Sequence, residues 1–410
     1  MSWRDKAAPA SLALACLAGF LAISRAQPAA AQILAGEVHA TSQNQLNDNF
    51  QGLASKTPPP VGTTRDDFIT TNTVGGSGTA ELGLQHLFAR GEVGKGIHLR
   101  STTFNSDILN LSGGINWAVT SACTGDVTVL LDQHQSDLQE LTVAIPNQSE
   151  TLSYGASGLC NVGSGYWAGM EGKRADVTNS ATVQQGANRT ETTVKTHFYY
   201  QRPSVSKLGG DLGYIERVYP QLNQTVDEYD AALVFERQIG DKTYLASSFG
   251  LAAVTAYSTT TTAGASSGNS TSINPTLSIN LTYAATGKLT TTLLISRTEE
   301  SNDQVISAVT TVDTAQVGAT WQVLPKVSAA ETASYTISSF QGGVALVGVN
   351  AGTLQQTRED RRFRNSMSVS YDFSNRISFN AQYVFSDQTS TLATKTFTSN
   401  AIFFGAKVTY

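Results

Sequence analysis

From Asp66 to the last residue, apolar and polar side chains alternate with a period of two, segment after segment. In the stretch TLSINLTYAATGKLTTTLLIS, for example, Leu277, Ile279 and Leu281 alternate with small polar residues before a tight turn. Successive side chains of a β-strand point to opposite faces of a sheet. The pattern predicts an all-β chain of hairpins, in which each strand has one apolar and one polar face.

The connections between these segments alternate in length. Longer connections rich in Ser, Thr, Gly and Asn separate the short ones. Short turns at one end and long loops at the other are typical of an outer-membrane β-barrel, with the short turns in the periplasm, whereas a soluble sandwich does not require this regularity. The short turns are expected near residues 91–94, 122–125, 160–163, 202–206, 239–242, 285–288, 323–326 and 374–376.

The composition agrees with a barrel that has lipid outside and a polar lumen. Only 14% of the residues are charged, against about 25% in ordinary soluble domains. A secreted β-solenoid or adhesin has a similar composition. After residue 32, no apolar run approaches the ~18–20 residues of a membrane helix. Membrane insertion therefore requires a closed, transmembrane antiparallel β-barrel.

The first 31 residues have the features of a secretory signal peptide. Arg4 and Lys6 precede the apolar run LALACLAGFLAI, and small residues lead to cleavage after Ala31. An uncleaved anchor fits less well because the run is short, and lipidation fits less well because Cys16 lies inside it. Cleavage changes the 27 basic and 32 acidic residues to 24 and 31, a net charge of −7. This acidic balance argues against a nucleic-acid partner.

Residues 32–65 differ from the rest of the chain. They are polar, and three consecutive prolines interrupt them at residues 58–60. Leu46, Phe50 and Leu53 have helical spacing, so a short amphipathic helix that plugs the lumen is one interpretation. A loose periplasmic tail is the other and is preferred. The barrel is then expected to span residues 66–410.

The number of strands follows from parity, because both termini are expected in the periplasm. Seventeen segments can be read from Thr79 to Tyr410, and residues 67–74 supply one more. The prediction is about 18 strands, and 16 remain possible if residues 97–112 contain fewer breaks. A barrel of this size is wide enough for a water-filled lumen.

The chain ends on the alternating segment FTSNAIFFGAKVTY. We expect this segment to be the closing strand, which pairs with the first strand and removes both sheet edges. It also resembles the C-terminal insertion signal of outer-membrane proteins, whose last residue is aromatic, so the barrel assembly machinery is an expected partner. The residues of this signal are Ile402, Phe404, Ala406, Val408 and Tyr410.

The C-terminal third resembles the β-barrel porin family linked to exopolysaccharide loci. The resemblance lies in a strand start that contains Arg and Asp (TREDRRFRN), a Tyr-Asp-Phe hairpin and the closing strand TSNAIFFGAKVTY, and it covers roughly residues 230–410. It implies a channel in the outer membrane of a Gram-negative bacterium, passing hydrated solutes or an exported polysaccharide. Two alternatives remain open: a general small-solute porin, and a structural or adhesive barrel without a channel.

The sequence gives no reason to expect an enzyme, a metal or a cofactor. None of the five histidines has metal-ligand spacing with another; they are His39, His86, His98, His134 and His197. His134 lies near Asp132, Ser136 and Asp137, but Ser and Asp are common in barrel loops. Catalysis is therefore not assigned to any residue.

Cys123 and Cys160 are the cysteines that remain after cleavage of the signal peptide. Both fall at expected periplasmic turns, separated by a strand, a loop and a strand. In an oxidising compartment an even pair favours a disulfide with a structural role over two free thiols.

A charged cluster begins where a long loop enters a strand. If alternate members face inward, they set a charged constriction that gives a preference for ions or sugar acids. If they face outward, they bind lipopolysaccharide phosphates; a solvated loop stem is the third interpretation. The same reasoning makes Glu299, Glu300 and Asp303 an acidic rim. The cluster consists of Arg358, Glu359, Asp360, Arg361, Arg362 and Arg364.

Overall fold

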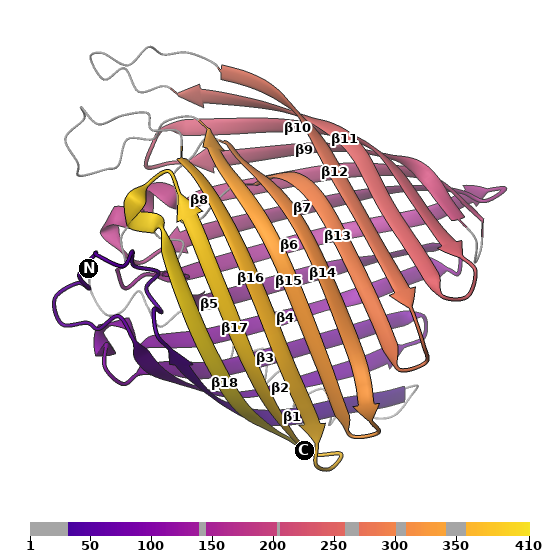
Figure 1. Ribbon diagram of the computed structural model, residues 1–410. Helices are drawn as coiled ribbons and strands as arrows, with labels where there is room; N and C mark the ends of the chain where they lie inside the picture. The colour runs from indigo at the N-terminus through magenta and orange to yellow at the C-terminus, as the bar shows by residue number, and fades with distance from the viewer. Residues whose placement is uncertain (1–31, 139–144, 203–205, 259–269, 301–308, 342–357) are drawn as a thin grey trace, which may run out of the picture.

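The computed structural model describes residues 32–138, 145–202, 206–258, 270–300, 309–341 and 358–410. These residues form an 18-stranded antiparallel sheet that closes into a barrel, because β18 pairs with β1. Figure 1 shows β18, in yellow, beside β1, in indigo. The strands are β1 (Gln32–Asn47), β2 (Asp67–Leu82), β3 (Gln85–His98), β4 (Ser106–Thr120), β5 (Cys123–Gln135), β6 (Gln148–Gly163), β7 (Tyr166–Asn179), β8 (Arg189–Arg202), β9 (Ser206–Tyr219), β10 (Gln224–Ile239), β11 (Thr243–Ser258), β12 (Ser270–Ala284), β13 (Leu289–Glu300), β14 (Val309–Leu324), β15 (Val327–Gln341), β16 (Arg358–Asp372), β17 (Ile377–Ser390) and β18 (Phe397–Thr409).

The two ends of the barrel differ in the length of their connections. At the end that holds Tyr410, two to four residues join consecutive strands, as at 83–84, 121–122 and 373–376. At the other end most connections are longer, although four residues (220–223) join β9 and β10. The longer ones carry the short 3₁₀ helices η2 (Thr102–Phe104), η3 (Thr182–Ala187) and η4 (Ala393–Lys395). This asymmetry is the one expected of an outer-membrane barrel.

The turn predicted at residues 91–94 is wrong, because these residues lie inside β3 and the turn is at 83–84. Glycine in the stretch GEVGKG suggested the turn. In the structure Gly91 pairs with Gly76, and a Cβ on Gly94 would lie 2.4 Å from the carbonyl oxygen of Asn72. These glycines allow neighbouring strands to approach closely rather than reversing the chain.

The count of eighteen strands is confirmed, but the predicted boundary between residues 32–65 and the barrel is wrong. Residues 32–47 form β1, which pairs with β2 and β18 over most of its length. The segments read as 67–74 and as starting at Thr79 belong to one strand, β2. The predicted signal peptide, residues 1–31, lies outside the described residues, and its cleavage stays a prediction.

The outer surface of the barrel is apolar, the reverse of a soluble protein. Val317 and Phe404 each expose 54% of their surface, and Val408 exposes 49%. Alternate positions of β18 supply this face, so four of the five insertion-signal residues, Ile402, Phe404, Val408 and Tyr410, are exposed. A band of such residues around a closed sheet is a lipid-facing surface. Within the described residues, no helix is long and apolar enough to cross a membrane.

The long loops fold over part of the outer mouth. Phe50 from the β1–β2 loop, Phe104 from η2 and Leu138 after β5 form a buried group, here called the mouth cluster. The Arg65 guanidinium fixes the β1–β2 loop by donating to the carbonyl oxygens of Leu53, Ala54 and Thr57 at 2.7–2.8 Å. The short amphipathic helix, the less favoured interpretation of Leu46, Phe50 and Leu53, does not form, because Leu46 is an exposed residue of β1 while Phe50 and Leu53 are buried in the loop.

Candidate functional site

The candidate site is the inner wall of the barrel, which is built from every second residue of each strand. On β12, Ile273, Leu277 and Ile279 lie on the outer face with the apolar residues of β11, and Ser, Asn and Thr occupy the positions between them. Because strand side chains alternate strictly, an apolar exterior places the polar set inside. The lumen is therefore lined mainly by hydrogen-bonding groups.

One part of the inner wall, on β7 to β10, carries paired charges. Lys207 donates to Glu236 at 3.0 Å, and its ammonium group lies 3.9 Å from the centre of the Tyr199 ring. Nearer the outer mouth, Arg217 donates to Glu191 at 3.1 Å and to Glu228 at 2.6 Å. These pairs fix charges of both signs along the wall.

Another part of the wall is neutral. Within the described residues of β12, β14 and β15, the inward positions hold no Asp, Glu, Lys or Arg. Pairs such as Thr314 and Thr336, whose hydroxyl oxygens are 3.5 Å apart, line it instead. A solute in the lumen therefore has charged groups on one side and neutral hydrogen-bonding groups on another.

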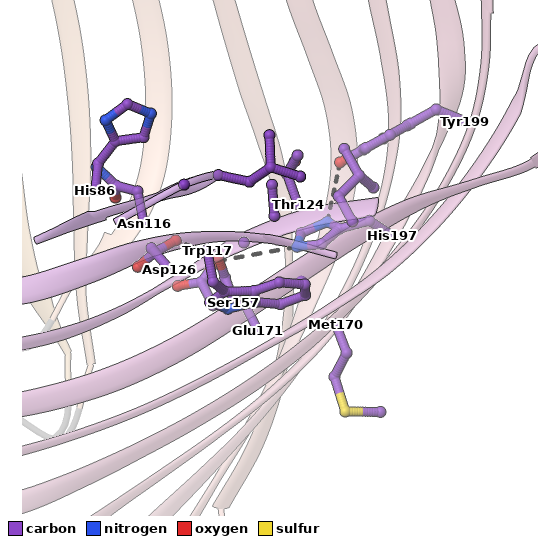
Figure 2. Close-up of a pocket in the computed structure, with 16 residues that line it drawn as sticks. His86, Asn116, Trp117, Thr124, Asp126, Ser157, Met170, Glu171, His197 and Tyr199 are labelled. Carbon is purple, nitrogen blue, oxygen red and sulfur yellow. Dashed lines mark hydrogen bonds and ion pairs between the residues drawn. The ribbon is translucent and has the colours of Figure 1, made fainter. Parts of the chain in front are cut away.

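A cavity of about 740 Å³, here called the inner cavity, lies against the charged part of the wall near the short-turn end. Figure 2 shows His197 between Tyr199 and Glu171. Its Nδ1 is 2.8 Å from Asp211 and 2.9 Å from the Tyr199 hydroxyl, and its Nε2 is 3.9 Å from Glu171. The Tyr199 hydroxyl also donates to Asp211. This network holds the side chains in place and leaves carboxylates facing the lumen.

A second cavity, of about 280 Å³, lies at the outer mouth and is here called the mouth pocket. One side is formed by the inner faces of β16, β17 and β18, and the other by Phe50, His98 and Leu138 beside the loops. His98 is fixed there, because its Nδ1 lies 3.0 Å from Asp67 and the side chains of both residues are almost fully buried. Asp67 also accepts hydrogen bonds from the backbone N–H groups of Phe68 and Arg100.

The structure divides the predicted arginine cluster between the two faces of β16. Arg362 and Arg364 line the mouth pocket. Arg358 also points inward, but its guanidinium donates to Asp360 at 2.5 and 3.0 Å, and both residues are buried. Arg361 faces outward and donates to Glu359 at 2.7 Å.

The remaining predicted residues lie away from both cavities. Glu299 accepts from the Thr311 hydroxyl at 3.0 Å and Glu300 from the Thr298 hydroxyl at 3.0 Å, at the long-loop end of β13. Asp303, the third residue of the predicted acidic rim, lies outside the described residues. The structure contains a disulfide between Cys123 and Cys160, which are directly opposite each other on β5 and β6. Both cysteines belong to the outward set of residues near the short turns.

The histidine and acid pattern near residue 134 forms an ordinary hydrogen-bonded pair, in which His134 Nδ1 lies 2.6 Å from Asp132. Ser136 instead accepts a hydrogen bond from the Asn147 side chain at 2.7 Å. Among the described residues, no three His, Cys, Asp or Glu side chains are grouped to hold a metal ion.

The charged groups on the inner face of β7 to β10 were not predicted from the sequence. Lys195, Asp211 and Lys207 were not named as candidates, and His197 was considered only as a metal ligand, although each occupies a position that alternates with apolar outward residues such as Phe198 and Leu212. The signal that could have found them is the alternation of outward apolar and inward polar residues along each strand. Which charges meet across strands depends on the register, which the alternation alone does not define.

No protein-family model matches the chain, and no curated protein sequence matches it. Among solved structures, the chain is similar to Pseudomonas aeruginosa OccK2 (OpdF) in complex with glucuronate, with a TM-score of 0.50 and 9% identity over 92% of this chain and 98% of that chain. It is also similar to the unliganded ferric citrate transporter FecA, with a TM-score of 0.52 and 10% identity over 86% of this chain and 60% of that chain.

At these identities the likeness shows the fold, a large closed β-barrel. The resemblance to the family linked to exopolysaccharide loci gains no support from a family match. The closed sheet, the apolar exterior and the polar lumen are those of an outer-membrane protein of a Gram-negative bacterium.

Proposed function

We propose that the protein is a passive channel for small hydrated solutes across the outer membrane. The observation that carries the proposal is the polar inner face of a closed barrel of eighteen strands. Barrels of 16–18 strands leave an aqueous passage, whereas barrels of about 8 strands are filled by their own side chains. A polar lumen lowers the cost of moving a hydrated solute through lipid.

The proposal favours small solutes over an exported polysaccharide. Export was implied by the resemblance of the C-terminal third alone. The two cavities have volumes of about 740 and 280 Å³, which lie within and just below the range of about 300–1,000 Å³ for small-molecule sites. OccK2, which shares the fold, is described in complex with glucuronate. The expected surroundings are outer-membrane lipid and lipopolysaccharide, after insertion by the barrel assembly machinery.

Swelling of proteoliposomes tests this function directly. Purified full-length protein is reconstituted into vesicles loaded with dextran, which are then diluted into isotonic solutions of uncharged sugars of increasing size. A channel admits small sugars, so the vesicles swell at a rate that falls as the sugar grows. Folded protein that gives no swelling with any sugar would support the structural or adhesive barrel instead.

A further inference from the structure

The mouth pocket places two arginine side chains next to an apolar patch. Its wall on β16 presents Arg362 and Arg364. Beside them lie Val384, Ala401 and Phe403, of which Val384 and Ala401 are paired across β17 and β18. On an inner wall that is mainly polar, this apolar patch next to two guanidinium groups is an exception.

The described residues that line the pocket carry more positive than negative charge. Asp137 is the one carboxylate among the described residues that line it, against the two arginines. His98 also lines it and is held by Asp67. The inner cavity is the opposite, because Asp126 and Glu171 line it without any Lys or Arg among its described lining residues.

The apolar patch is covered from the loop side. Phe50 and Ile69 line the same pocket, and Phe50 is held by the mouth cluster, with its ring 5.6 Å from that of Phe104. Polar groups of Gln45, Ser386 and Ser399 complete the lining. Small-molecule sites are typically concave and mostly apolar, with a few polar groups that set orientation.

We propose that the mouth pocket binds small organic anions, with a carboxylate at Arg362 and Arg364 and a flat or apolar body against Val384, Ala401 and Phe403. The inference rests on the proposed channel function and specifies its substrate class. Guanidinium groups suit this task, because their planar donors match the two oxygens of a carboxylate. The acidic inner cavity would then repel the anion, so the binding step lies at the outer mouth.

Current block in planar bilayers tests the inference, with benzoate as the probe and benzamide as its neutral analogue. Benzoate is expected to reduce the KCl current of the full-length channel at lower concentration than benzamide. Arg364→Gln should raise the apparent Kd for benzoate at least ten-fold. Arg361→Gln is the matched control, since Arg361 is a near neighbour on β16 that faces outward, and it should leave the Kd unchanged.

A second variant separates the binding site from the folding of β16. Phe403→Ser removes apolar surface from the pocket without changing a charge. It should also weaken the binding of benzoate and so raise its apparent Kd. The inference would be overturned if benzoate and benzamide blocked the current equally, or if Arg364→Gln and Arg361→Gln had equal effects. In either case the KCl current itself would still support the channel. Folded protein without KCl current would contradict the channel, and calorimetric titration with benzoate would then decide the binding site independently.

Discussion

The charged side chains of β8, β9 and β10 show how individual residues stabilise the wall. The side chains of Arg217 and Glu228 are 8% and 4% exposed and are joined by a 2.6 Å contact. Glu191 accepts a second hydrogen bond from Arg217. Removing one partner of a buried pair leaves a charge without compensation, whereas removing both does not.

Arg217→Met should therefore reduce the free energy of unfolding by about 3–5 kcal/mol. Arg217→Met combined with Glu228→Met should recover much of this loss. Urea unfolding in phospholipid vesicles measures both. A double variant as unstable as the single one would show that the contact between these two residues is not what stabilises this region.

The disulfide is a second prediction at the residue scale. It links residues that are 37 apart in the chain, and a closed loop of this kind typically contributes about 2–4 kcal/mol. Reductant should lower the stability of the protein by this amount and should not affect a variant that carries both Cys123→Ser and Cys160→Ser. The channel conductance should stay unchanged, because both cysteines face outward. Equal sensitivity of the two proteins to reductant would contradict the bond.

Alternate residues of each strand face lipid and the lumen, and substitutions of two neighbouring residues on one strand test this assignment of faces. On β14, Val317 faces lipid and Gln316 faces the lumen. Val317→Arg should destabilise the barrel by about 2–4 kcal/mol, the cost of arginine near the middle of the bilayer. Gln316→Arg should have much less effect when unfolding is measured in vesicles. A similar loss for both would mean that the assigned faces are wrong.

β1 is a wall strand, and its removal tests the corrected boundary. A chain without residues 32–47 loses both ladders of β1 and exposes the edges of β2 and β18. It should fail to give the heat-modifiable migration of a folded barrel. Insertion of a short Gly/Ser segment after Val61, which is fully exposed in the loop, should preserve that migration. A folded barrel without residues 32–47 would restore the tail interpretation.

The elements that were predicted correctly are those in which alternation is strong. β12, β17 and β18 have clear apolar faces, and their hairpins were located. β1 was missed because Ser42 and Asn44 weaken its outer face, and Asn44 instead accepts a hydrogen bond from Thr70 on β2. The mouth pocket could not be predicted, because it joins β1, β16, β17 and β18 with loops that are distant in sequence. Such contacts depend on closure and register.

At the scale of the whole molecule, the barrel encloses a polar lumen, the proposed passage, with a basic pocket at the outer mouth and an acidic cavity near the short turns. The charged wall of β7 to β10 and the neutral wall of β12, β14 and β15 extend between the two ends. This arrangement gives a solute polar contacts throughout its path. The central claim is that the passage conducts.

Single-channel recording in planar bilayers tests that claim most directly. Full-length protein, shown to be folded by heat-modifiable migration, is added to a bilayer in KCl, and heat-unfolded protein serves as the control. We predict steady steps of current that grow linearly with voltage and are missing in the control. Folded barrels that insert into the bilayer and give no current would contradict the channel and support a structural or adhesive role.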